Sequence, residues 1–245
     1  MRFPRFHAYV AGLLALPLAL AACDMGSGHD KVLGPVDVAA GGSVSDANTV
    51  NGAVDVANHA RAGDAHTVNG SIHVAGGGQV AAAETVNGSI ELGEHAGAEK
   101  ATAVNGSVTL DRGATVAGDA TTVNGDLRLA QDAAVRGALT NVSGHITVDG
   151  ARVGAGITTA NGDIDITGNA VVDGGIKVEE SKGIFAIHLG KDRVPRIVIG
   201  PGATVNGPLD FEKPVKLYIS DQARVAGPIS GAQAVKFSGP TPPAS

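Results

Sequence analysis

Several short segments of this chain alternate apolar and polar residues, and each follows a copy of one four-residue sequence. In Ser71-Ile72-His73-Val74 and Ser89-Ile90-Glu91-Leu92, every second residue is Val, Ile or Leu. Alternation with a period of two is typical of a β-strand with one buried face, and these aliphatic side chains suit a half-buried pleated surface. The pattern therefore predicts a series of short strands that share one core.

The four-residue sequence is T-V-N-G. It occurs at 49–52, 67–70, 85–88 and 122–125, with looser copies at 103–106, 141–144 and 159–162. The glycines are 18, 18, 18, 19, 19 and 18 residues apart. A fixed short period is the signature of a repeat architecture. Asn-Gly favours a tight turn because both residues tolerate positive φ, and we interpret each copy as a corner between strands.

These features predict an all-β fold: a single-stranded parallel β-helix, or β-solenoid, with coils of about 18 residues. Neighbouring coils would lie about 4.8 Å apart. A right-handed coil is favoured, and the handedness stays open. A weaker element such as Val116-Ala117-Gly118 would supply another side of the coil. We place the valine of each repeat (Val68, Val86 and Val104 among them) in the core. A helical solenoid does not fit, because glycine inside a helix costs roughly 1 kcal/mol relative to alanine.

The first 22 residues are a predicted signal peptide. Arg2 and Arg5 precede an apolar core at 10–22 that is too short to span a membrane as a helix. The segment ends in Ala21-Ala22-Cys23, which resembles the lipobox of bacterial lipoproteins. That resemblance implies cleavage before Cys23 and lipid attachment to it. The alternative is an ordinary signal peptide followed by a chance Ala-Ala-Cys.

The rest of the chain divides by repeat style. We expect a lipid-anchored tether at 23–31, a solenoid at 32–238 and a disordered tail at 239–245. Within the solenoid, the regular repeats occupy 32–178 and an irregular coil occupies 179–196. A second style of repeat follows at 197–238. The aromatic residues of the mature chain all lie late in the sequence, and we expect them to cap the core: Phe185, Phe211, Tyr218 and Phe237.

The second repeat style also carries a family resemblance. The pattern I-x-I-G-x-G-A-x-V-x-G at 197–207 is similar to bactofilins, bacterial β-helical proteins that polymerise. The pattern V-N-G-S-I-x-V resembles the β-strand repeats of bacterial adhesins. The resemblance implies solenoid geometry and a polymer-forming or adhesive role. Unlike this chain, bactofilins typically face the cytoplasm and have no lipobox.

Charge narrows the range of partners. After removal of residues 1–22 the chain has 16 Lys and Arg against 24 Asp and Glu. A net charge of about −8 argues against nucleic acid and anionic lipid head groups as partners.

Candidate chemistry is sparse. Acidic pairs occur at Asp163 with Asp165 and at Glu91 with Glu94, and we expect these side chains to be solvated outward positions. Histidines are scattered without the spacing of a metal site: His59, His66, His73, His95, His145 and His188. We predict no catalytic residues, no metal site and no cofactor.

The most regular polar feature is a column of asparagines at the corners: Asn51, Asn69, Asn87, Asn105, Asn124 and Asn161. Stacked amides can hydrogen-bond from coil to coil, which is a structural role. The alternative is a flat T-x-N face that binds ice, glycans or crystals.

The sequence therefore predicts a non-enzymatic, lipid-anchored scaffold or adhesin-like rod of the bacterial envelope. Its partners would be the membrane, through the lipid on Cys23, and further copies through a solenoid end, the N-terminal end being favoured. An envelope glycan is a further expected partner, and the alternative function is polysaccharide binding or modification. We expect the periplasmic side; Asp24 hints at the inner membrane, and the choice between membranes stays open.

Overall fold

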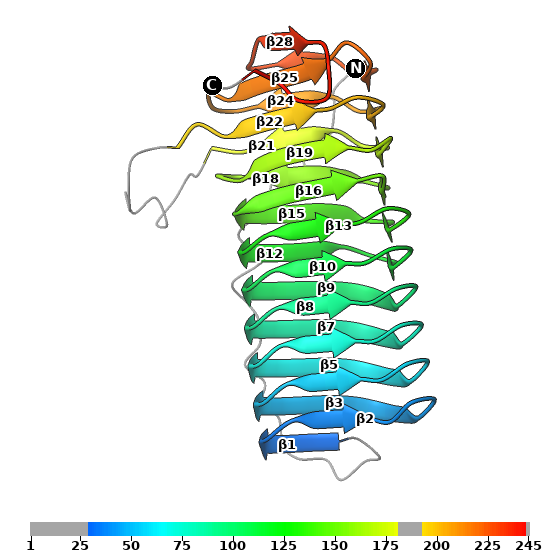
Figure 1. Ribbon diagram of the computed structural model, residues 1–245. Coiled ribbons are helices and arrows are strands. Elements are labelled where there is room, and N and C mark those ends of the chain that lie inside the picture. The colour runs from blue at the N-terminus through cyan, green and yellow to red at the C-terminus, as the bar shows by residue number, and fades with distance from the viewer. Residues whose placement is uncertain (1–28, 181–192, 244–245) are drawn as a thin grey trace, which may run out of the picture.

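The computed structural model describes residues 29–180 and 193–243, which form a stack of β-strand coils (Figure 1). Equivalent strands of successive coils pair in parallel; in the regular part Ser43 lies opposite Arg61 and Arg61 opposite Gln79, a step of 18 residues. The all-β solenoid prediction is confirmed. No helix among these residues is long and apolar enough to cross a membrane.

One wall of the stack is an 11-stranded sheet to which each coil contributes one strand. Its strands are β2 (Val36–Val38), β4 (Val54–Val56), β6 (Ile72–Val74), β8 (Ile90–Leu92), β10 (Val108–Leu110), β13 (Leu127–Leu129), β16 (His145–Asp149), β19 (Asp163–Thr167), β22 (Arg196–Ile199), β25 (Lys216–Ser220) and β28 (Ala234–Phe237). Most are the alternating segments that follow an Asn-Gly corner. Strand β22 pairs with β19 in unbroken register, although 28 residues separate the two strands in sequence.

The other walls belong to a 17-stranded sheet. It starts with the longer strands β1 (His29–Leu33), β3 (Ser43–Asn51), β5 (Arg61–Asn69), β7 (Gln79–Asn87) and β9 (Gly97–Asn105). It continues as pairs of short strands: β11 (Thr115–Val116) and β12 (Ala120–Asn124), β14 (Ala134–Val135) and β15 (Ala138–Ser143), β17 (Arg152–Val153) and β18 (Gly156–Thr159), β20 (Val171–Val172) and β21 (Ile176–Val178), β23 (Thr204–Val205) and β24 (Leu209–Phe211), β26 (Arg224–Val225) and β27 (Ile229–Ser230).

One inserted residue explains why the long strands split. Val116 lies opposite Ala98, and Ala120 lies opposite Ala101. Three residues therefore lie between Val116 and Ala120, whereas only two lie between their partners Ala98 and Ala101 in the preceding coil. The extra residue bulges at the corner and interrupts pairing, as an insertion in a strand does.

Stacked aliphatic side chains fill the bore. A representative column is fully or almost fully buried along the whole stack: Val54, Ile72, Ile90, Val108, Leu127, Ile146, Ile164, Ile197 and Leu217. Such ladders exclude water at every coil, and burial of each side chain contributes about 1.5–3 kcal/mol.

The aromatic side chains do not form the cap that the sequence suggested. Phe211 lies in the main core above Val178. Tyr218 and Phe237 instead form a separate buried cluster with Val198, away from the bore, because Tyr218 occupies an outward strand position between the inward Leu217 and Ile219. Phe185 lies outside the described residues.

The prediction that the repeat valines face the core is wrong. Thr67 and Thr85 are 4% and 1% exposed, whereas Val68 and Val86 are only partly buried. The Thr hydroxyl donates to the carbonyl of the corner glycine one coil below, from Thr67 to Gly52 at 2.9 Å and from Thr85 to Gly70 at 2.8 Å. The alternation of inward and outward side chains shifts by one residue at the corner, so Thr67 and Ile72 both point inward although they are five positions apart, an odd number.

Except at Gly144, which has positive φ, the corner glycines are required for close approach rather than for positive φ. Neither Asn51 nor Gly52 has positive φ, so the interpretation of Asn-Gly as a positive-φ turn is wrong. A Cβ on Gly70 would lie 1.8 Å from the carbonyl oxygen of Gly52, and one on Gly88 would lie 1.8 Å from that of Gly70. Only glycine fits in this column.

Candidate functional site: a charged strip on the upper coils

The predicted asparagine column is present as a hydrogen-bonded ladder over five coils. The amide of Asn69 donates to Asn51 at 2.8 Å, and the same bond recurs from Asn87, Asn105 and Asn124 to the asparagine below at 2.9, 3.0 and 3.1 Å. These side chains are exposed at the corner. Each amide both donates and accepts, so the ladder links coil to coil.

The sixth asparagine lies outside the ladder. Asn124 is followed in register by Ser143, which ends the run of amides. Asn161 instead accepts a hydrogen bond of 2.5 Å from Lys213. Nearby, Lys177 contacts Glu179 at 2.8 Å and Glu212 at 3.2 Å. The hydrogen bond to Glu179, helped by Glu212, raises the pKa of Lys177.

The threonines and asparagines of the repeats do not form a shared flat face on the surface. The threonines are buried in the bore, and only the asparagines are exposed. The ice- or crystal-binding alternative therefore loses the hydroxyl row on which it depended.

The histidines lie apart from one another. His59 and His95 have positive φ and lie against Gly77 and Gly113 of the following coil on the same wall, so that a Cβ on either glycine would lie within 2.5 Å of the imidazole. His66 and His73 lie 3.4 Å from Glu84 and Glu91. His188 lies outside the described residues. Among residues 29–180 and 193–243, no three His, Cys, Asp or Glu side chains are grouped as metal ligands.

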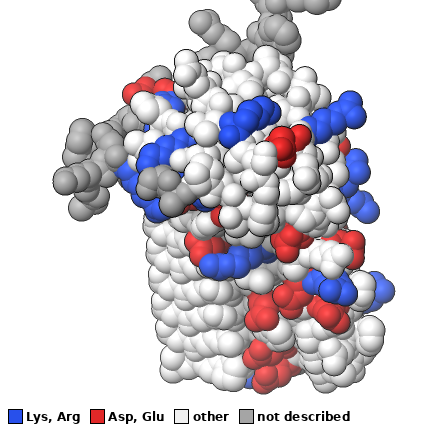
Figure 2. Space-filling model, turned by 45° about the horizontal axis from the view of Figure 1, so that its top comes forward, with Lys and Arg blue, Asp and Glu red and all other residues white. Residues whose placement is uncertain are grey.

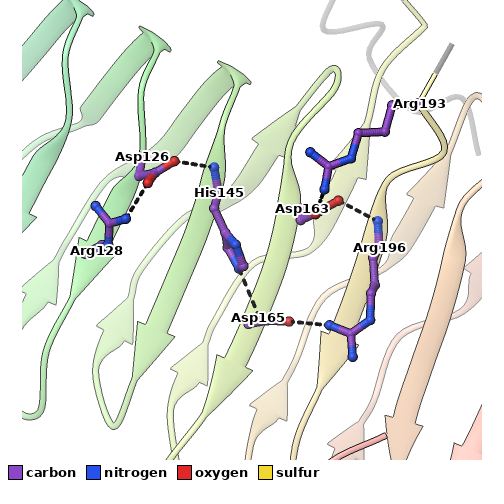
Figure 3. Close-up of polar contacts among 7 residues, drawn as sticks. All are labelled: Asp126, Arg128, His145, Asp163, Asp165, Arg193 and Arg196. Carbon is purple, nitrogen blue, oxygen red and sulfur yellow. Dashed lines mark hydrogen bonds and ion pairs between the residues drawn. The ribbon is translucent and has the colours of Figure 1, made fainter. Parts of the chain in front are cut away.

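A charged strip crosses the outer face of the 11-stranded sheet on β13, β16, β19 and β22 and the residues beside them (Figure 3). We define it as Asp126, Arg128, His145, Asp163, Asp165, Arg193 and Arg196. Asp163 and Asp165 alternate with the buried Ile164 and Ile166, so their carboxylates share the outer face. Paired strands stack His145 beside Asp163, and Asp163 beside Arg196 in the next coil.

Two carboxylates of the strip bind the backbone of the next coil. Asp126 accepts from the His145 N–H at 2.8 Å, and Asp163 accepts from the Arg196 N–H at 2.9 Å. Lower in the same column, serine hydroxyls accept in the same way, as from the Ser89 N–H to Ser71. Sequence reasoning missed this ladder, although the Ser or Asp directly after most of the Asn-Gly pairs was a signal for it.

Asp163 and Asp165 both form ion pairs, so the prediction that their carboxylates are solvated is wrong. Asp163 pairs with Arg193 and its side chain is only 14% exposed. Asp165 lies 3.0 Å from His145 Nε2 and 3.4 Å from Arg196 Nη1. Glu91 and Glu94, by contrast, are exposed as expected.

Asp165 sets the protonation of His145. Its hydrogen bond, with its charge and those of Asp163 and Asp126, raises the pKa of His145 above the ordinary value of 6.5, against a smaller opposing effect of burial. The raised pKa favours the protonated imidazole, which the neighbouring carboxylates stabilise. The strip contains carboxylates, guanidiniums and one imidazole but no hydroxyl or thiol nucleophile.

A hollow of about 410 Å³ lies at the upper end of the strip, lined by Asp163, Arg193, Val194, Arg196 and Lys216. A second hollow, of about 450 Å³, runs across several coils on a different wall. It is lined by Ser43, Val44, Arg61, Ala62, Gly63, Gln79, Val80, Ala81, Gly97, Ala98, Glu99, Thr115, Ala117 and Arg136.

No protein-family model, curated protein or solved structure matches this chain. The geometry of the coils and the chemistry of their outer faces therefore carry the functional argument.

Proposed function

We propose that this protein is a non-enzymatic rod of the bacterial envelope, anchored through lipid on Cys23 and acting as a scaffold or adhesin-like spacer. The observation that carries the proposal is the continuous stack of coils in one register. Every coil is bonded to its neighbours along all walls, so bending the stack would strain many backbone hydrogen bonds at once. Cys23 and Asp24 lie outside the described residues, and the anchor rests on their sequence.

The two ends of the rod supply a means of association with further copies. Strands β1 and β2 each pair with one strand, as do β27 and β28 at the other end. Exposed large apolar side chains concentrate there: Val32 and Leu33 at the N-terminal end, and Ile229 and Val235 at the C-terminal end. Unpaired strand edges with apolar side chains favour strand addition.

Sedimentation velocity on the chain from Asp24 onward, with electron microscopy of the same sample, tests this proposal. We expect an elongated particle whose length increases with concentration by end-to-end addition. A compact particle would contradict the rod, whereas a single elongated species at all concentrations would remove the self-association and leave the spacer.

A second candidate, polysaccharide binding, is favoured by the longer hollow. Its floor is lined by small residues such as Gly63 and Ala81, and it runs along the rod axis. Within the described part of the chain, the charged ends of Arg61, Glu99 and Arg136 have no hydrogen-bond or ion-pair partner. Affinity electrophoresis in envelope glycans, with Arg136→Ala as the variant, tests it: retardation that the variant loses would support glycan binding.

A further inference from the structure

The rod has two regions of opposite charge. Residues 29–180 contain 19 Asp and Glu against 8 Lys and Arg, whereas residues 193–243 contain 6 Lys and Arg against 3 Asp and Glu. Figure 2 shows blue side chains gathered toward the C-terminal end and red ones on the coils below. The net negative charge of the chain therefore conceals a basic end.

The hollow beside the charged strip lies at this basic end. We call Arg193, Arg196 and Lys216 the cationic shoulder. Arg196 and Lys216 occupy paired positions on β22 and β25 and therefore project from neighbouring strands about 4.8 Å apart. Asp163 is the one acid lining the hollow, so three positive charges face one negative charge there.

Arg196 is held in place before any ligand arrives. Its guanidinium lies over the ring of Tyr218 at 5.4 Å from the centroid and contacts Asp165 through Nη1 at 3.4 Å. Tyr218 is itself packed in the cluster with Val198 and Phe237. A guanidinium fixed by stacking loses little side-chain entropy when it binds an anion.

The shoulder keeps unused donors. The contacts of Arg193 and Arg196 with Asp163 and Asp165 each use one terminal nitrogen of a group that carries five N–H donors. The ammonium of Lys216 is exposed and has no partner among residues 29–180 and 193–243. An incoming oxyanion would therefore meet several free donors without first breaking every ion pair.

We propose that the cationic shoulder binds a phosphate group. A phosphate monoester carries nearly two negative charges at neutral pH, which matches the excess of two positive charges lining the hollow, and its oxygens accept from the planar guanidinium fork. Val194, 43% exposed on the rim, would contact carbon atoms attached to the phosphate. The proposal is independent of whether the rod self-associates.

Isothermal titration of the chain from Asp24 onward with inorganic phosphate tests the site, and sedimentation with phosphatidylcholine vesicles containing phosphatidic acid tests a lipid source. Arg196→Gln should weaken binding about tenfold and Lys216→Gln about threefold, because each removes a charge-assisted bond. Asp163→Asn should strengthen binding about threefold, because it removes the competing carboxylate but keeps an oxygen to accept from the Arg196 N–H.

Arg152→Gln is the matched control, since Arg152 is an exposed arginine in an ion pair of 2.7 Å with Asp173 on another wall. It should leave binding unchanged. Binding to phosphate alone identifies a free anion as ligand, and binding only to the vesicles identifies the lipid head group. No binding to either, or binding that Arg196→Gln and Lys216→Gln both leave intact, would overturn the proposal.

Discussion

The lower coils, around β3 to β9, and the upper coils, from β19 to β28, use the same backbone stack but different side-chain contacts. In the lower coils, an 18-residue step places the threonine and the asparagine of each repeat over their counterparts, and the asparagines form a neutral ladder. In the upper coils the step varies, so unlike residues meet and opposite charges pair, as Asp163 does with Arg193. Strict repetition allows a side chain to bond to its own kind in every coil, as the asparagines do, although ion pairs such as Lys100 with Glu84 occur in the lower coils as well.

The largest difference should come from the corner glycines. Gly88→Ala should destabilise the protein by about 3 kcal/mol, because the added methyl group would overlap the Gly70 carbonyl and every coil would have to shift. Urea unfolding followed by circular dichroism measures the loss. Gly76→Ala is the control in a neighbouring coil, since its Cβ would lie no closer than 3.4 Å to another atom. Equal midpoints for the two variants would contradict the close approach.

The amide ladder should have an intermediate effect. Asn87→Ala removes two ladder bonds, to Asn69 and from Asn105, and should cost about 1 kcal/mol. Asn206→Ala, in the upper coils, removes one exposed bond of 3.2 Å to Asp173 and should cost less. If the two losses in unfolding free energy were the same, the ladder would contribute nothing beyond single exposed bonds.

The smallest effect should be a dependence on pH in the upper coils. Because the folded pKa of His145 lies above its unfolded value, the folded protein binds this proton more tightly. The resulting stability is fully present below pH 6.5 and is lost as the pH rises through the raised pKa. His145→Gln should flatten this part of the stability curve. An NMR titration should show a lower His145 pKa in Asp165→Asn; an unchanged pKa would rule out Asp165 as the cause.

The fold was predictable because it depends on a local, repeated pattern. The inward or outward direction of Thr67 and Val68 was not, because alternation reverses across the Asn-Gly corner and only the backbone path reveals the change. The charged strip could not be predicted from the sequence either, because Arg193 and Arg196 lie 30 or more residues from the aspartates that they contact. Net charge was misleading for a related reason: it averages over two regions of opposite sign.

The central claim is a single register in which the repeat threonines line the bore and the valines face outward. Thr85→Asp and Val86→Asp test it most directly, by thermal and urea unfolding of both variants. The structure predicts a loss of about 4 kcal/mol for Thr85→Asp, which buries an unpaired charge, and about 1 kcal/mol or less for Val86→Asp. A Val86→Asp protein that unfolds while Thr85→Asp stays stable would contradict the register.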